Sequence, residues 1–137
     1  PMISIDVDWP VHKNNIRIIP LVGPSSILLA LMASGLNGQQ FAFNGYLPIE
    51  SNARISKIIE LEKLSISRNQ TQIFIEAPYR NQKLLEQLVK TCSDSTNLCI
   101  ASHLTFSNEM VATRTVKEWK RCLPDINKIP TIFLLHG

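Results

Sequence analysis

The stretch Thr71–Arg80, TQIFIEAPYR, decides how we expect the chain to fold. Its first half is rich in β-branched and aromatic residues, which is typical of a buried strand, and the run stops at a proline. A carboxylate, Glu76, and a guanidinium, Arg80, stand where the strand ends. Ligands collect at the carboxyl ends of strands in open α/β sheets, so one interpretation is the wall of a binding site. The other is a structural ion pair between the two side chains, and both stay open.

Segments on either side of this stretch alternate between strand and helix patterns. Apolar, β-branched runs predict the further strands 16–22, 41–46, 97–104, 109–116 and 131–136. Helical spacing predicts helices over 27–33, 52–65 and 80–93, and the capping-box spacing of Thr115 and Glu118 predicts a short one that contains Trp119. This alternation predicts an α/β domain with a mixed, mostly five-stranded sheet flanked by helices, the strand pair within 97–116 making it mixed.

The Gly-Pro-Ser-Ser turn at 23–26 precedes a helix that is apolar on every side. We expect Ser25 or Ser26 to be its N-cap and Gly35 to follow its last turn, with both helix faces packed. Serine hydroxyls and backbone amides at a positive helix N-terminus also suit an anion or a polar ligand group. The serines are therefore either a plain cap or part of a site.

Composition limits the class of protein. The 137 residues fit one domain, 45% are hydrophobic and 18% charged, and neither a membrane span nor a signal peptide is visible. Cys92, Cys99 and Cys122 lack metal-type spacing and are expected to be reduced thiols in a cytoplasmic protein. No metal site is predicted, because His12 and His136 lack partners at ligand spacing. The net charge of +3 neither proves nor opposes nucleic-acid binding.

Polar and basic residues outside the strands give weaker hypotheses. His103 and Glu109 lie in another loop that follows a strand, where a histidine is more often a hydrogen-bonding loop residue than a catalyst. Five basic residues have two possible interpretations: they form a basic surface for RNA, or several of them simply solvate the outer faces of helices. They are Arg54, Lys57, Arg68, Arg80 and Lys83. The common phosphate-loop, dinucleotide and nucleophile-elbow motifs are absent from the sequence.

Six short motifs, taken in order, resemble the tetrapyrrole methylase family of S-adenosylmethionine-dependent methyltransferases, and within it the ribosomal RNA branch. They are IPLVGPSS, ASGL, FAFNGYLP, FIEAPYR, Leu104-Thr105 followed by Glu109, and TRTVKEW. The likeness runs from about residue 16 to residue 137, and its value lies in the order of the motifs.

The resemblance implies a two-domain enzyme with its cofactor in the cleft between two α/β domains, in a homodimer. Residues 15–137 would be the C-terminal domain, and residues 1–14 a divergent or truncated lead-in. The N-terminal domain, with its glycine-rich cofactor loop, would then lie outside this chain. S-adenosyl-L-methionine is the implied cofactor, and RNA, specifically rRNA methylated at a ribose 2′-oxygen, the implied substrate.

The resemblance also implies which residues form the site. Ser25 and Ser26 match the loop that contacts the cofactor. Glu76 and Ala77 match the strand end beside its adenosine part, and Ile132 matches a further wall.

If the methyl group is transferred to an RNA hydroxyl, two further residues become catalytic candidates. Glu109 would help to remove the proton, and Arg80 would hold a phosphate. The alternative function is a non-catalytic dimerisation or binding domain that keeps the fold without the glycine-rich loop.

Overall fold

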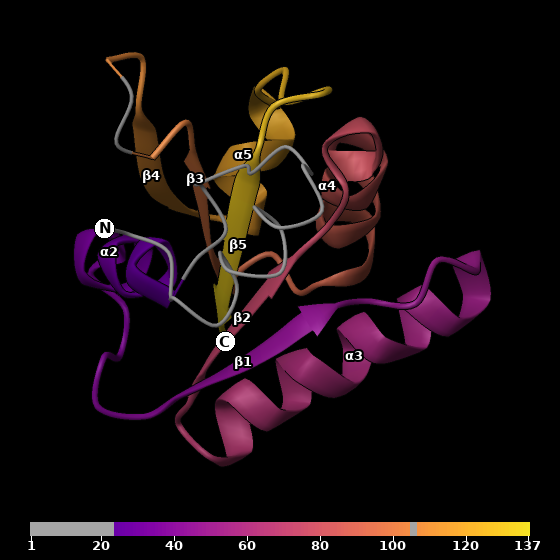
Figure 1. Ribbon diagram of the computed structural model, residues 1–137. Coiled ribbons are helices and arrows are strands. Elements are labelled where there is room, and N and C mark those ends of the chain that lie inside the picture. Colours follow the sequence, from indigo (N-terminus) through magenta and orange to yellow (C-terminus); the bar gives the residue numbers. More distant parts are fainter. Residues whose placement is uncertain (1–23, 105–106) are drawn as a thin grey trace, which may run out of the picture.

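The computed structural model describes residues 24–104 and 107–137, so the expected strand 16–22 and the lead-in 1–14 lie outside the described residues (Figure 1). Helices and strands alternate along the described chain. In order, they are α2 (Pro24–Ser34), β1 (Phe41–Tyr46), α3 (Ser51–Ser67), β2 (Thr71–Ile75), the 3-10 turn η1 (Pro78–Arg80), α4 (Asn81–Thr91), β3 (Asn97–Ser102), β4 (Met110–Thr115), α5 (Val116–Arg121) and β5 (Thr131–His136).

The strands of the described chain form one five-stranded sheet in the order β1-β2-β5-β3-β4. The pair β1 and β2 is parallel, whereas β5 runs antiparallel to both β2 and β3, and β3 and β4 form an antiparallel pair. The predicted α/β fold with a mixed sheet is therefore confirmed. The predicted strands 71–78 and 97–104 are shorter than expected, because the chain leaves the sheet at Glu76 and His103.

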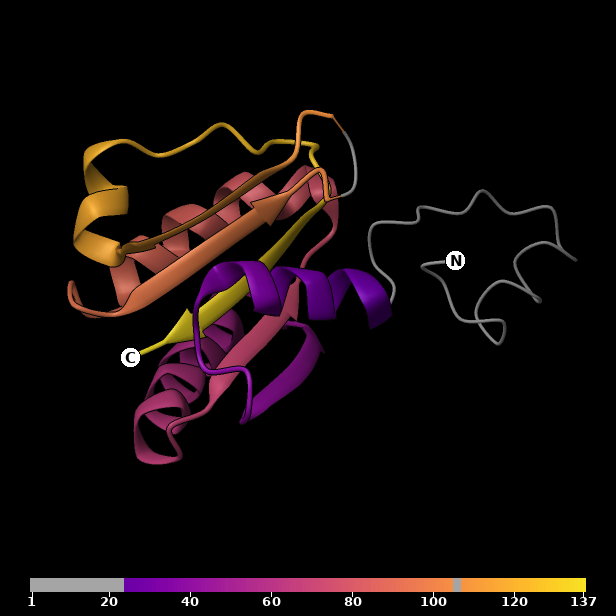
Figure 2. The same cartoon turned by 90° about the vertical axis from the view of Figure 1, so that its left-hand side faces the viewer.

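Alternating side chains on the central strands divide the core into two layers. Helices lie on both faces of the sheet, α2 on one face and α3, α4 and α5 on the other (Figures 1 and 2). Phe74 and Phe133 stack with ring centroids 5.7 Å apart, on the face covered by α3, α4 and α5. Ile73, Ile132 and Leu134 point to the opposite face, which α2 covers. Strands that are buried on both sides explain why their sequences are continuous apolar runs.

The predicted capping box at the start of α5 is confirmed. The Thr115 hydroxyl accepts a hydrogen bond from the Glu118 amide, and the Glu118 carboxylate accepts one from the Thr115 amide. Helix α5 thereby holds Trp119 against the sheet, where its buried indole donates a hydrogen bond to the Leu98 carbonyl (2.8 Å).

Helix α2 corrects the expected N-cap. It begins at Pro24, so Ser25 and Ser26 lie inside its first turn and neither is the cap. Proline is favoured at a first helical position, because its fixed φ is already helical and that position needs no amide donor. Gly35 follows the helix with a φ of +73°, as predicted.

The predicted packing of α2 on both faces is wrong for this chain. Ala30 and Leu31 are buried against the sheet, but Leu28, Leu29 and Met32 are 49%, 40% and 79% exposed. The apolar composition of α2 favours burial of its whole surface. The described residues, however, give α2 only one neighbour to pack on, the sheet, so its other face stays exposed.

We predict a sharp contrast between two neighbouring residues of α2. Leu31→Ala should lower the free energy of unfolding by about 2–5 kcal/mol, because it opens a cavity beneath the helix. Met32→Ala, at an exposed site, should change it by no more than about 0.5 kcal/mol. Urea denaturation of both variants measures this difference, and equal losses would contradict the described orientation of α2.

Candidate functional site

Three of the predicted site residues, Glu76, Ile132 and Glu109, lie at one end of the sheet. Ile132, near the start of β5, is opposite Ile75 at the end of β2 and also opposite Ala101 near the end of β3. The last residue of β3, Ser102, is opposite Met110 at the start of β4. Antiparallel pairing therefore brings the segment after β2, the start of β5 and the β3–β4 connection to the same end of the sheet.

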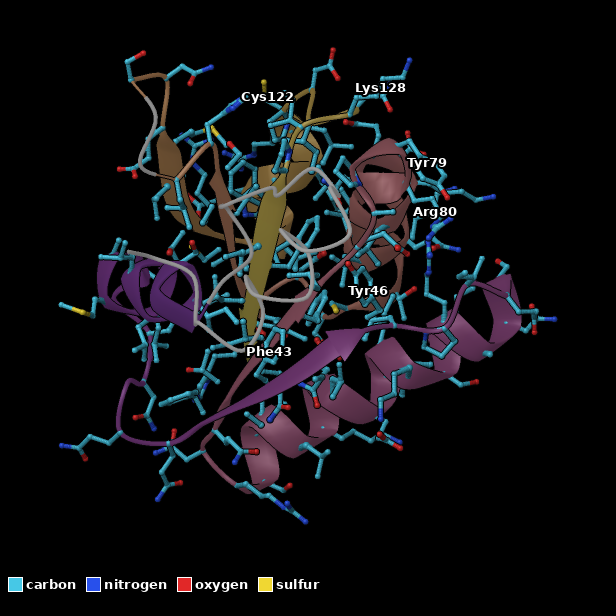
Figure 3. All side chains as sticks on the ribbon, viewed as in Figure 1. Phe43, Tyr46, Tyr79, Arg80, Cys122 and Lys128 are labelled. Atoms are coloured by element: carbon cyan, nitrogen blue, oxygen red, sulfur yellow. The ribbon has the colours of Figure 1, made fainter. Side chains whose placement is uncertain are left out.

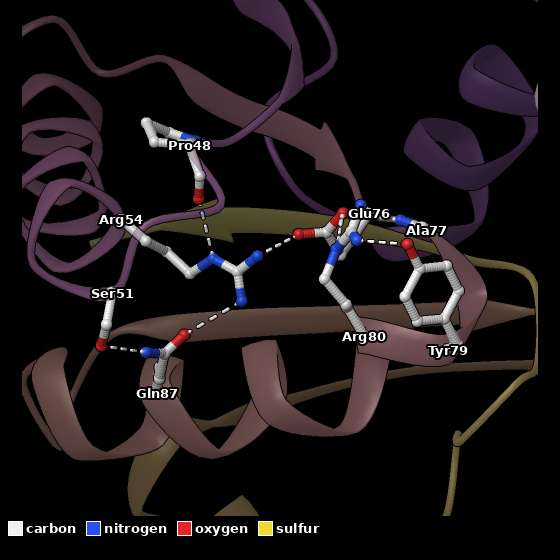
Figure 4. Close-up of polar contacts among 8 residues, drawn as sticks. All are labelled: Pro48, Ser51, Arg54, Glu76, Ala77, Tyr79, Arg80 and Gln87. Atoms are coloured by element: carbon white, nitrogen blue, oxygen red, sulfur yellow. Dashed lines mark hydrogen bonds and ion pairs between the residues drawn. The ribbon is translucent and has the colours of Figure 1, made fainter.

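The centre of this site is the buried carboxylate of Glu76 (Figure 4). Its side chain is 1% exposed and forms ion pairs with two arginines, Arg54 and Arg80. The Arg80 Nε lies 3.1 Å from Glu76 Oε1, which also accepts a hydrogen bond from the Ala77 amide at 2.7 Å. The structural ion pair between Glu76 and Arg80 is thus confirmed.

Arg54, on the first turn of α3, is fully buried. Its Nε donates to the Pro48 carbonyl (3.0 Å), and its Nη1 donates to Gln87 Oε1 (3.1 Å). The Gln87 amide in turn donates to the Ser51 hydroxyl (Figure 4). A guanidinium is tolerated in the interior only when its charge is paired and its donors are bonded, as they are here. Both interpretations of Arg54 as a surface residue are therefore wrong.

This cluster of Arg54, Glu76 and Arg80 carries two positive charges against one negative charge. The Arg80 side chain is 25% exposed, so the surplus positive charge lies toward solvent. Partial desolvation lowers the pKa of Arg80, but the ion pair with the Glu76 carboxylate outweighs this, so the pKa is raised overall. Both carboxylate oxygens of Glu76 already have partners, so this side chain fixes its neighbours in place.

The other predicted site residues occupy different environments. Ser26 is fully buried in the first turn of α2, the turn that also contains Ser25. Ile132 is buried in the sheet, whereas Glu109 is exposed before β4. His103 adopts a positive φ of 52°, and its amide donates to the Pro130 carbonyl.

An apolar hollow marks this end of β5. Its empty volume is about 140 Å³ when the open solvent above it is included. It is lined by Ala101, Leu104, Pro130, Thr131 and Ile132. These side chains give this end of the sheet a shallow apolar wall, whose enclosed part is too small to hold a water molecule.

The structure also adds residues that sequence reasoning missed. Asn81, at the start of α4, is fully buried, and its Oδ1 has no hydrogen-bond partner in the structure. Arg54 had a visible signal, because the buried stripe of α3 runs through Arg54, Ile58, Leu61 and Ser65 at helical spacing. A charged residue on such a stripe predicts a buried partner elsewhere.

Comparison with known proteins finds relatives that cover most of the chain. No family model matches the chain. Ribosomal RNA small subunit methyltransferase I from Vibrio cholerae is 31% identical over 129 residues, which cover 92% of this chain and 43% of that protein. The enzyme of the same name from Haemophilus influenzae is 29% identical over the same share of the chain. In the one from Escherichia coli O157:H7, 32% identity extends over 78% of the chain.

The resemblance to the tetrapyrrole methylase family is confirmed. The chain spans less than half the length of these curated relatives. The fold agrees with two solved structures, the methyltransferase CobJ (TM-score 0.56, 16% identity) and the cobalt precorrin-4 methyltransferase CbiF (TM-score 0.54, 17% identity). The match to CobJ covers 96% of this chain and 55% of CobJ, and the match to CbiF covers 97% of this chain and 58% of CbiF.

Three further features of the described chain concern metal binding, membrane helices and cysteines. Across residues 24–104 and 107–137, no three His, Cys, Asp or Glu side chains are grouped to hold a metal ion. None of the helices in these ranges has the length and apolar character that a membrane crossing requires. All three cysteines are free thiols, with Cys122 exposed and Cys92 and Cys99 buried.

We predict that the buried guanidinium is essential for stability. Arg54→Met should lower the free energy of unfolding by about 3–5 kcal/mol, because it removes a buried partner of Glu76. The matched control is Lys57→Met, one turn further along α3, where an exposed pair with Glu60 is lost. That change should cost less than about 1 kcal/mol. Similar losses in both variants, measured by chemical denaturation, would contradict the role assigned to Arg54.

Proposed function

We propose that this chain forms one wall of the cofactor cleft of an S-adenosylmethionine-dependent methyltransferase that acts on RNA. The observation that carries the proposal is the similarity, over 92% of the chain, to proteins named ribosomal RNA small subunit methyltransferase I. The proposed substrate is rRNA, methylated at a ribose 2′-oxygen, in the cytoplasm.

The residues at the strand ends fit an adenosine-containing cofactor. Ile132 and the other residues of the hollow give an apolar surface for a base. Asn81 Oδ1 is a buried acceptor that has no partner among residues 24–104 and 107–137, which suits a hydroxyl or amino donor of a ligand. The proposed contacts also include Ser25, Ser26 and the backbone at Glu76 and Ala77. The Glu76 carboxylate would act by positioning this segment, since its oxygens are already paired.

The chemistry requires little of the protein. S-adenosylmethionine supplies a methyl group that its sulfonium already activates. The residues of the chain need to orient the acceptor, exclude water and accept a proton. Glu109, exposed at the start of β4, is the proposed base for a ribose hydroxyl, and Arg80 the proposed contact for a phosphate.

The proposed partners are an N-terminal domain of the same protein and a second copy of the chain. Exposed apolar side chains on α2 and β1 support a contact of this kind, among them Met32 (79% exposed) and Phe43 (46% exposed). A soluble domain rarely leaves such side chains uncovered over a wide area.

A second candidate is a non-catalytic dimerisation or binding domain. The same exposed apolar residues favour it, because they suit a protein contact whether or not a cofactor binds. The two candidates differ in what binds at the strand ends.

Calorimetric titration of S-adenosylhomocysteine tests the proposed function. We expect tight binding when the chain is joined to the proposed N-terminal domain, and weak or no binding to the chain alone, because half of the proposed cleft would be missing. Asn81→Leu, in the joined protein, should weaken this binding by roughly 5- to 150-fold, the effect of losing one buried polar contact of 1–3 kcal/mol.

The absence of binding to either protein would overturn the methyltransferase assignment and favour the non-catalytic domain. The control is Lys83→Ala, which removes an exposed charge from the same helix. Its binding should equal that of the unchanged protein.

A further inference from the structure

Two tyrosines and two cations form a row beside the end of β2. Tyr46, the last residue of β1, is opposite Ile75 and is 65% exposed. Tyr79 and Arg80 follow β2 in η1, and Tyr79 is 63% exposed. In the view of Figure 3, Lys128, Tyr79, Arg80 and Tyr46 follow one another down the molecule. We call these four residues the tyrosine–cation row.

The Tyr79 ring is held firmly although it is exposed. The Arg80 guanidinium lies over the ring, 4.6 Å from its centroid, and also bonds the Tyr79 hydroxyl. Arg80 is itself fixed by Glu76, whose carboxylate is buried. One turn of 3-10 helix that begins with Pro78 fixes the backbone. An aromatic ring held in this way loses little conformational freedom when a ligand stacks on it.

The loop between α5 and β5 brings the backbone of Lys128 to the first residue of η1. Its amide donates to the Pro78 carbonyl at 2.9 Å, and its φ is +62°. The Asn81 side-chain amide donates to the Ile129 carbonyl, and Gln82 bonds Pro124 and Ile126 of the same loop. The Lys128 side chain is exposed, and within the described ranges its ammonium forms no ion pair.

We propose that the tyrosine–cation row binds a single-stranded segment of the RNA substrate, with an unpaired base stacked on Tyr79 and a neighbouring phosphate on Lys128. The inference deepens the proposed function, on which it rests. Exposed aromatic rings beside cations are the combination that single-stranded nucleic acids require: the ring takes the base and the cation the backbone. Of the two cations in the row, Arg80 is paired with Glu76, so Lys128 is the one left for a phosphate. Lysine is depleted from the cores of protein interfaces, which favours RNA over a protein partner at Lys128. The exposed leucine, methionine and phenylalanine side chains that suit a protein contact lie on α2 and at Phe41 and Phe43 of β1.

Stacking is tested first, by fluorescence anisotropy of the intact protein with a labelled single-stranded RNA of mixed sequence. Tyr79→Ala should raise the dissociation constant by roughly 5- to 150-fold, the range for the loss of one base–aromatic stack. Tyr79→Phe keeps the ring and should bind like the unchanged protein. Tyr79→Leu keeps apolar bulk without a π face and should bind as weakly as Tyr79→Ala.

The phosphate contact has its own readout, the salt dependence of binding. Lys128→Ala should make the slope of log affinity against log salt shallower by about 0.7, the value for one phosphate of a single strand. Tyr79→Ala should leave that slope unchanged. The matched control is Arg68→Ala, which removes one exposed charge just after α3, beside the opposite end of β2, and should change neither affinity nor slope.

Several results would overturn the proposal. These are unchanged RNA affinity in Tyr79→Ala, unchanged slope in Lys128→Ala, or a Tyr79→Leu variant that binds like the unchanged protein. Titration of S-adenosylhomocysteine in the same variants separates this proposal from the proposed function. If the variants bind both S-adenosylhomocysteine and RNA like the unchanged protein, the proposal for the row is wrong and the proposed function stands. If the variants lose RNA binding and the unchanged protein binds no S-adenosylhomocysteine, the proposal for the row stands and the methyltransferase assignment is wrong.

Discussion

The buried Glu76 carboxylate connects parts of the chain that are far apart in the sequence. Through Arg54 it is joined to the start of α3 and to the Pro48 carbonyl after β1, and through Gln87 to the middle of α4. Through Arg80 it fixes the segment that follows β2. A lone buried charge is strongly unfavourable, so these elements remain together or the cluster fails as a unit.

This constraint also determines what the end of the sheet offers to a ligand. The carboxylate is fully occupied, so the chemistry facing solvent is a guanidinium, two tyrosine rings and a lysine, beside the apolar hollow at the start of β5. Such a surface can take an aromatic base on one side and phosphates on the other. That combination agrees with similarity to enzymes named for ribosomal RNA.

Short-range rules predicted much of the fold from the sequence. The strands β1 and β5, the capping box of Thr115 and Glu118 and the glycine after α2 each depend on a few neighbouring residues, and all were predicted. The burial of Arg54 was missed, because it depends on partners 22 and 33 positions away. Likewise, the composition of α2 does not reveal which of its apolar faces has a neighbour. The contacts of Ser25, Ser26, Ala77 and Ile132 with a cofactor stay predictions.

The central claim is that Glu76 holds Arg80, and with it the ring of Tyr79, in a fixed position. NMR relaxation of the arginine side-chain Nε–H groups tests it most directly. We expect the Arg80 Nε–H group to be as ordered as that of buried Arg54, and Glu76→Gln to make Arg80 as mobile as exposed Arg68. An Arg80 side chain that is already as mobile as Arg68 in the unchanged protein would contradict it.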